Sequence, residues 1–296
     1  MFTCGITDVL MEESLMARIH GIVGVSAGAA FGCNIKSMQP GRAIRYTCKY
    51  MRDSRYMSLR HWLREGNLFS TRFVYDEVPL RLDPFDWEAY HANPQPFHLV
   101  CTDIDPQEPV YHILDDRDFP RAMQWIQASA SLPVVASPVE IDGRRLLDGG
   151  LTDSNPHKYY QGQGYARNIV ILTQPRAYRK HFGRAAQLWR VIEAHRPGVA
   201  QLMLRRPAMY NGQLDYIAAQ EALGNTLLIA PEEPLSISRL ATDPEQLLRV
   251  YRQGRALATA LMPRIRRFLM ADCLPPQTEE RKTDSRPPKR HGRTFH

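Results

Sequence analysis

Short apolar runs alternate along the chain with longer stretches of helical periodicity. The short runs are rich in β-branched side chains, which is typical of buried strands. They predict strands over residues 19–24, 97–103, 110–114, 168–173 and 226–230. The helical pattern predicts helices over residues 28–33, 42–51, 120–131, 183–195, 209–223 and 244–270. Strands that alternate with helices in this way indicate an α/β fold with a largely parallel sheet.

One folded unit is expected to account for most of the chain. No internal repeat and no strong linker interrupts residues 1–274, which we expect to form a single domain. Residues 67–96, rich in Pro, Asp and aromatic side chains, are predicted to be a loop that crosses the edge of the sheet. Residues 275–296 contain almost no apolar side chain and predict a disordered basic tail.

The composition favours a cytoplasmic globular protein. With 296 residues and 44% hydrophobic content, the chain can bury a substantial core. Its apolar runs stop well short of the roughly 20 residues of a membrane span, and its N-terminus lacks the basic start and cleavage site of a signal peptide. The five cysteines are scattered without a CxxC pair, so the sequence predicts neither a disulfide framework nor a zinc site.

The net charge of +7 is weighted toward the C-terminus, where residues 275–296 hold six basic and three acidic side chains. Such a tail attracts polyanions without specificity, so a solvated end is expected and contact with a polyanion is the alternative. The chain has no recognised nucleic-acid-binding motif, and we expect no specific nucleic-acid partner.

A candidate nucleophile follows the first predicted strand. Residues 24–29 read GVSAGA, so Ser26 has Gly24 and Gly28 two positions to either side. A sharp strand-to-helix turn strains its central residue, and small neighbours at these positions avoid a clash. Ser26 would then stand at a helix N-terminus, where the dipole and the Ala27 backbone N–H favour a developing oxyanion. An ordinary tight turn is the alternative.

A serine nucleophile needs a base, which in the commonest arrangement is a histidine. The chain has ten histidines, but none lies in a convincing place. His20 and His98 fall in predicted strands, and His157 follows a proline. A structural or exposed role is therefore expected for each of them.

An aspartate is the other candidate base. Asp148 ends an apolar run and precedes Gly149 and Gly150, a pair that permits backbone angles other residues resist. The alternative is that this turn merely closes a hairpin spanning residues 139–147.

Together the two motifs resemble the signature of the patatin-like phospholipases, which use a Ser-Asp dyad without histidine. Residues 128–156, ASASLPVVASPVEIDGRRLLDGGLTDSNP, are similar to the family's approach to its aspartate. The likeness runs from residue 1 to about residue 231, and residues 45–69 look closest to bacterial patatin-like esterases. It implies a three-layer α/β/α fold with a mostly parallel central sheet, hydrolysis of a lipid acyl ester by Ser26 with Asp148 as base, and no metal or organic cofactor.

One part of the family pattern is missing. Patatin-like enzymes carry a Gly-Gly-Gly-x-Arg-Gly loop after their first strand, and its backbone N–H groups form the oxyanion hole. No such loop precedes Ser26, and MFTCGITDVLMEES resembles the helix that follows it, with Gly5 matching a glycine of that helix. We therefore expect a chain that begins late and keeps only the Ala27 N–H as oxyanion donor. Because losing one donor commonly costs about 100- to 1000-fold in rate, a catalytically impaired member that binds an acyl ligand or a partner is the alternative.

A basic, aromatic stretch is the candidate lipid contact. Residues 42–64 set seven arginine and lysine side chains among tyrosines and Trp62. Such a stretch suits contact with the anionic headgroups of a membrane surface. The alternative is a pair of helices whose aromatic side chains pack inward and whose arginines are solvated.

Overall fold

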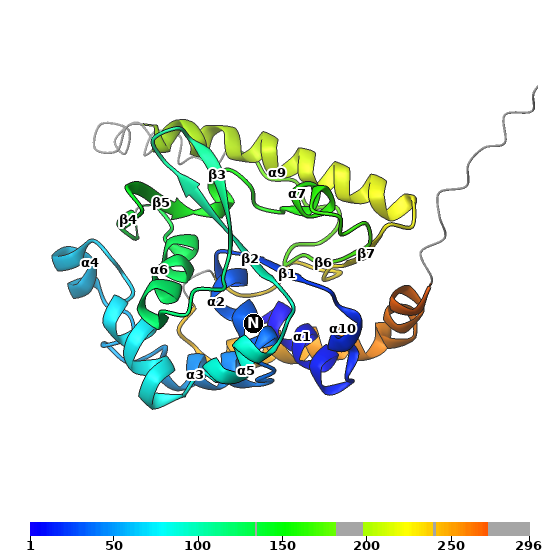
Figure 1. Ribbon diagram of the computed structural model, residues 1–296, viewed down its shortest axis with the longest axis horizontal. Coiled ribbons are helices and arrows are strands. Elements are labelled where there is room, and N and C mark those ends of the chain that lie inside the picture. Colours follow the sequence, from blue (N-terminus) through cyan, green and yellow to red (C-terminus); the bar gives the residue numbers. More distant parts are fainter. Residues whose placement is uncertain (134, 182–197, 239–240, 272–296) are drawn as a thin grey trace, which may run out of the picture.

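The computed structural model of the chain describes residues 1–133, 135–181, 198–238 and 241–271 (Figure 1). The helix expected over 183–195 and the tail expected over 275–296 lie outside the described residues. Among the helices that are described, none is long and apolar enough to cross a membrane.

The predicted strands are all present, with ends shifted by a few residues, and the hairpin considered over 139–147 adds two more. They are β1 (Ile22–Val25), β2 (Phe97–Asp103), β3 (Glu108–Ile113), β4 (Val139–Ile141), β5 (Arg144–Asp148), β6 (Asn168–Ile171) and β7 (Thr226–Ile229). The β4–β5 turn contains Asp142 and Gly143, both at positive φ, as a tight hairpin requires.

The helices expected outside 183–195 are confirmed, although the one ending at Ala222 begins earlier than its pattern indicates. The α-helices are α1 (Phe2–Glu12), α2 (Ala27–Lys36), α3 (Arg42–Tyr50), α4 (Leu59–Glu65), α5 (Trp87–Ala92), α6 (Phe119–Ala130), α7 (His157–Gly162), α9 (Val199–Ala222) and α10 (Pro244–Met270). Short 3-10 turns form η1 (Leu15–Arg18) and η3 (Gly149–Leu151), and a π-helix forms η2 (Phe73–Leu82).

The loop expected over 67–96 is wrong, because η2 and α5 occupy much of it. One of the prolines in this segment, Pro79, would ordinarily break regular structure. In the fold it lies inside η2 and is buried together with Phe73 and Val78. Burial of these apolar side chains thus outweighs the local preference for a loop.

The main sheet is mixed, which corrects the expectation of a mostly parallel one. Its strands follow the order β1-β2-β5-β4, and β3 pairs with β2. Only the β1–β2 pair is parallel, whereas β2–β3, β2–β5 and β4–β5 are antiparallel. A second sheet contains the parallel pair β6 and β7. The apolar runs identify the strands, but their direction depends on pairing between distant segments.

The fully buried strand β2 organises the main sheet. Strand β3 pairs with β2 from His98 to Asp103, which takes one edge of β2. Strands β1 and β5 therefore share the other edge, where β1 pairs with Phe97–Val100 and β5 pairs with residues 101–103. Two strands that are far apart in the sequence thus end beside one another.

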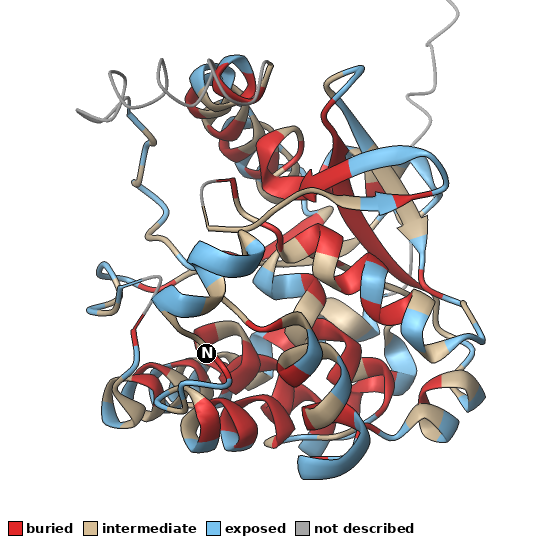
Figure 2. Ribbon diagram, turned by 90° about the vertical axis from the view of Figure 1, so that its left-hand side faces the viewer, coloured by how far each residue is buried: buried red, intermediate tan, exposed pale blue. Residues whose placement is uncertain are grey.

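Helices lie on both faces of β5. Leu146 packs into a hydrophobic cluster with side chains of α2, β2 and α6. Its neighbour Leu147 packs into another cluster, which includes Leu151 of η3 and Leu202 of α9. Buried residues accordingly run along the strands and along the inner sides of the surrounding helices (Figure 2).

Helices α1 and α10 pack side by side (Figure 1). A Cβ on Gly5 of α1 would lie 2.1 Å from the Tyr251 carbonyl oxygen, and one on Gly254 of α10 would lie 2.1 Å from the Phe2 carbonyl oxygen. The two backbones therefore approach more closely than any larger residue would allow. Side chains from α1, α10, β6 and β7 form a single hydrophobic cluster around this contact.

Candidate active site

Ser26 occupies a strained turn between β1 and α2. Its φ of 57° and ψ of −123° are unusual for a residue with a side chain, and α2 begins at the next residue. A Cβ on Gly24 would lie 2.3 Å from the Gly28 carbonyl oxygen, so the turn requires glycine at position 24. A Cβ on Gly28 would meet nothing within 4 Å, so packing does not require glycine there.

Ser26 and Asp148 reach the same point along β2. Val25, the last residue of β1, is paired with Val100, and Asp148, the last residue of β5, is paired with Cys101. Ser26 directly follows Val25. The shared edge of β2 thus brings together two residues that lie far apart in the sequence.

The hydroxyl of Ser129 ties this junction together. The Ser26 N–H donates to Ser129 Oγ at 3.1 Å, and Ser129 Oγ donates to the Val100 carbonyl oxygen at 2.6 Å. Ser129 is fully buried near the end of α6. Because the Ser26 N–H has this acceptor, the Ala27 N–H at the first position of α2 is the adjacent backbone donor, and no carbonyl within the helix accepts it.

Asp148 is held from several sides and is only 1% exposed. Its N–H donates to the Ser131 carbonyl oxygen at 2.9 Å, and its own carbonyl oxygen accepts from Thr102 Oγ1 at 2.9 Å. Its carboxylate Oδ1 accepts the Gly150 N–H at 2.7 Å. A carboxylate fixed in this way keeps one orientation at the end of β5.

The two glycines after Asp148 serve a different purpose from the one expected. Neither Gly149 nor Gly150 has a positive φ, so the turn does not depend on backbone angles reserved for glycine. A Cβ on Gly149 would instead lie 2.1 Å from the Val100 carbonyl oxygen. Gly149 is therefore required because η3 approaches the backbone of β2 closely.

Arg206 on α9 reaches the same turn. Its Nε donates to the Gly150 carbonyl oxygen at 2.7 Å. A Cβ on Gly150 would lie 2.9 Å from Asp148 Oδ1 and 3.1 Å from Arg206 Nη2, so the carboxylate and the guanidinium flank the same small space. A positive charge from the C-terminal half of the chain thus lies beside the candidate base.

The charge of the Asp148 carboxylate affects the pKa of two further side chains. Burial raises the pKa of the Cys101 thiol, and the Asp148 carboxylate raises it further. Burial likewise raises the pKa of the Tyr75 hydroxyl on η2, with smaller contributions from Tyr56 and Asp148. Both groups remain neutral near pH 7, and η2 is the helix that brings Tyr75 toward the site.

The histidines considered as bases are engaged elsewhere or exposed. His98 Nδ1 lies 3.0 Å from the Tyr159 hydroxyl, and His157 Nε2 lies 2.8 Å from Thr226 Oγ1. Burial lowers the pKa of both imidazoles. His20 is exposed. Across the described ranges, no group of three His, Cys, Asp or Glu side chains is arranged to hold a metal ion.

Sequence reasoning named Ser26, Ala27, Asp148 and the adjacent glycines, and the fold places all of them around one junction on β2. It named Ser129 only as part of the family-like segment and missed its two hydrogen bonds. It missed Arg206 completely, because an arginine within a long helix carries no local signal of what it contacts.

Comparison with known proteins gives three matches. The sequence model of the family described as "Patatin-like phospholipase" matches residues 1–159. A model described as a domain of unknown function (DUF6363) matches residues 196–270. An Escherichia coli (strain K12) relative described as "Uncharacterized protein YjjU" is 25% identical over 269 residues, which cover 86% of this chain and 71% of the relative. The match to the first model contains β1, β2 and β5 together with Ser26 and Asp148.

Proposed function

The chain belongs to the patatin-like phospholipase family, and we propose that it is a lipid acyl hydrolase with Ser26 as nucleophile and Asp148 as base. The observation that carries this proposal is the junction on β2, where β1 ends before Ser26 and β5 ends in Asp148. The positive φ of Ser26 and its position before α2 support it, because such a turn exposes a nucleophile at a helix N-terminus.

The reaction has two stages. Asp148 accepts the hydroxyl proton of Ser26 while Ser26 Oγ attacks the ester carbonyl carbon. The tetrahedral intermediate collapses, the ester C–O bond breaks, and the alcohol leaves with the proton from Asp148. Asp148 then removes a proton from water, whose oxygen attacks the acyl carbon. The bond from that carbon to Ser26 Oγ breaks, Asp148 returns the proton to Ser26 Oγ, and the fatty acid leaves.

The oxyanion of each tetrahedral intermediate needs backbone donors. The Ala27 N–H and the dipole of α2 are the groups of this chain that fit the role, since the Ser26 N–H is bound to Ser129. Ala27 and Gly28 are exposed, and a Cβ on Gly28 would meet nothing within 4 Å, so a substrate can approach this donor from solvent.

The proposal extends to architecture and setting. We assign the chain a three-layer α/β/α architecture, supported by the packing of Leu146 and Leu147 into separate clusters. Its substrate is a lipid or another acyl ester, met in the cytoplasm or at the surface of a membrane.

A fluorophosphonate probe tests the proposal, because it bonds to an activated serine Oγ and releases fluoride. We expect an adduct on Ser26, located by mass spectrometry. Ser26→Ala removes the labelled atom, whereas Ser54→Ala changes an exposed serine and should leave labelling intact. Asp148→Asn retains an oxygen for the Gly150 N–H but cannot take a proton, so labelling should fall by about 100-fold or more.

Asp76→Asn is the matched control for the aspartate, because Asp76 is exposed on η2. Failure of the chain to label, under conditions in which another serine hydrolase labels, would overturn the catalytic proposal. Binding of an acyl ligand without turnover would then be the better account.

A further inference from the structure

Helix α4 presents apolar side chains to the outside of the molecule. Leu59, Trp62 and Leu63 are 71%, 39% and 76% exposed, and no residue of this seven-residue helix is buried. Their spacing of three and four places them on one face. Large apolar side chains grouped on a surface mark a site of interaction.

On the opposite side of α4, His61 Nε2 lies 3.1 Å from the carbonyl oxygen of Ser54, which precedes the helix. His61 Nδ1 lies 3.7 Å from the carboxylate of Glu65 on the next turn of the same helix. The Ser58 hydroxyl accepts the His61 N–H at the start of the helix, and Gly66, at φ 71°, ends it. The helix lies at the edge of the molecule (Figure 1), and the exposure of Leu59, Trp62 and Leu63 shows that its apolar face is open to solvent.

Positive charge borders this apolar face. Arg60 and Arg64 lie one turn apart and are exposed, next to Leu63 on the helical wheel. Between residues 52 and 72 the chain has five arginines and two acidic residues. Long basic side chains beside leucine and tryptophan are typical of a helix that lies at an anionic lipid interface.

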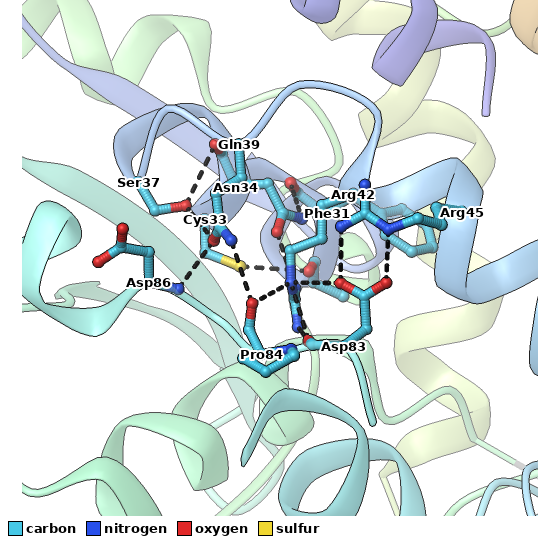
Figure 3. Close-up of polar contacts among 11 residues, drawn as sticks. Phe31, Cys33, Asn34, Ser37, Gln39, Arg42, Arg45, Asp83, Pro84 and Asp86 are labelled. Atoms are coloured by element: carbon cyan, nitrogen blue, oxygen red, sulfur yellow. Dashed lines mark hydrogen bonds and ion pairs between the residues drawn. The ribbon is translucent and has the colours of Figure 1, made fainter. Parts of the chain in front are cut away.

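The rest of the basic stretch has other partners. Arg42, only 5% exposed, and Arg45 both pair with Asp83, and Arg42 also donates to Asn34 Oδ1 (Figure 3). Arg52 pairs with Asp243, and Arg55 pairs with Asp53. The tyrosines of this stretch are buried in the cluster around Phe73. The tyrosines thus pack inward, whereas Arg45, Arg52 and Arg55 stay exposed in ion pairs. Within residues 42–64, only α4 combines exposed basic side chains with exposed large apolar ones.

Helix α4 is connected to the segment that supports the candidate active site. The Leu68 N–H donates to the Val135 carbonyl oxygen at 2.7 Å, and Asn67 Oδ1 accepts the Ser137 N–H at 2.8 Å. The same segment begins at Ser131, whose carbonyl oxygen accepts the Asp148 N–H. Residues just after α4 and the backbone of Asp148 therefore both hydrogen-bond to residues that follow α6.

We propose that α4 docks the protein on a membrane containing anionic lipids. Leu59, Trp62 and Leu63 enter the headgroup region, and Arg60 and Arg64 contact lipid phosphates. Delivery of an ester to Ser26 by this contact rests on the proposed function, whereas the docking itself does not. A second copy of the chain fits less well, because a standard interface takes about 20 to 30 residues a side and this face has three.

Vesicle binding tests the proposal in the Ser26→Ala background, which leaves the lipid intact. Sedimentation with phosphatidylcholine vesicles, with and without phosphatidylglycerol, should show binding that increases with the anionic lipid and weakens in high salt. Leu59→Asp with Leu63→Asp should weaken it about 100-fold. Arg60→Gln with Arg64→Gln should weaken it roughly 20-fold, and only on anionic vesicles.

Matched variants elsewhere give the comparison. Leu223→Asp changes a leucine that is 69% exposed after α9, and Arg249→Gln with Arg252→Gln changes two exposed arginines of α10. These should bind as the parent does, and all variants should keep its melting temperature. Absence of vesicle binding by the parent, or equal binding by the α4 and control variants, would overturn the proposal. So would a dimer in light scattering that the α4 leucine variant dissociates.

Activity measurements with Ser26 intact separate docking from catalysis. The α4 variants should hydrolyse a soluble short-chain ester at the parent rate and an ester embedded in anionic vesicles more slowly. If the soluble ester is not hydrolysed, the proposed function fails while vesicle binding still decides the docking proposal.

Discussion

Ser129 fastens the backbone of Ser26 to the central strand. Its hydroxyl accepts the Ser26 N–H at 3.1 Å and donates to the Val100 carbonyl oxygen at 2.6 Å. Val100 pairs with Val25, the last residue of β1, and the next residue of β2, Cys101, pairs with Asp148, the last residue of β5. The edge of β2 therefore changes from one partner strand to the other at Val100. A side chain thus supplies the hydrogen bonds that a continuous neighbouring strand would supply.

Replacing Ser129 with alanine should loosen the nucleophile turn. The change leaves the buried Val100 carbonyl without this donor, which should cost about 1–3 kcal/mol of unfolding free energy. A displaced Ser26 should label with fluorophosphonate about 10- to 100-fold more slowly. Ser131→Ala is the control, because the hydroxyl of this residue, which follows α6, donates to the Gln127 carbonyl oxygen of that helix. Equal labelling rates in the two variants would contradict the role given to Ser129.

The two glycines beside Ser26 should respond differently to alanine. At Gly24 the added Cβ would lie 2.3 Å from a backbone oxygen that cannot move alone, so we expect a loss of about 1–3 kcal/mol or more. At Gly28 the Cβ meets nothing, and alanine in a helix should be neutral or stabilising by up to about 1 kcal/mol. Thermal unfolding of the two variants measures this difference. Similar melting temperatures would show that the turn is not as tight as described.

Arg206→Gln should slow the labelling of Ser26 by about tenfold, because the variant loses the bond that holds the Gly150 carbonyl beside Asp148. Arg205 is exposed on the same helix, so Arg205→Gln is a matched control. Labelling rates at several probe concentrations would separate a slower chemical step from weaker binding. An unchanged rate in Arg206→Gln would mean that α9 does not act on the site.

Replacing Asp8 with asparagine should not destabilise the protein at pH 7, whereas the same change at Asp153 should. Burial raises the pKa of Asp8 above its usual 3.8, so its ionised form is disfavoured in the fold. The resulting penalty develops as the pH rises from 3.8 to the raised pKa and is complete above it. Asp8→Asn should therefore be at least as stable as the parent at pH 7, and the difference should vanish as the pH falls toward 3.8.

This prediction for Asp8 also depends on its hydrogen bonds. Both the Gly41 N–H and the Tyr251 hydroxyl donate to Asp8 Oδ2, so one amide oxygen can replace it. Asp153 receives Tyr111 on Oδ2 and Gln213 on Oδ1, and asparagine would lose one of these bonds. Asp153→Asn should thus lower the melting temperature at pH 7. Equal behaviour of the two variants across a pH series would contradict this account.

The sequence predicted much of the local structure because periodicity is a local property. The runs at 97–103 and 226–230 became β2 and β7, and the pattern at 244–270 became α10. The direction of the strands was beyond such patterns. β1 runs parallel and β5 antiparallel to β2 along the same edge, and no single segment encodes how each of them pairs with β2.

The sequence predicted which residues belong to the candidate site, but not the contacts that make those residue types necessary. Gly149 was expected to permit a special backbone angle, whereas it allows close approach to the Val100 carbonyl. The arginines at 42 and 45 appeared as part of one basic surface, and only the fold shows that Asp83 engages both. Charge spacing gives the face of a helix, but burial depends on segments elsewhere in the chain.

The close packing of α1 against α10 joins the segment that matches the patatin-like model to the segment that matches the second model. Gly5 lies in the segment of residues 1–159 and Gly254 in the segment of residues 196–270. Each glycine lets the backbone of the opposite helix approach closely. A duplication or exchange that separated the segments would expose the cluster between them to water and favour aggregation. Substitutions along this contact must therefore be compatible with both helices, so the two segments are expected to evolve as a pair.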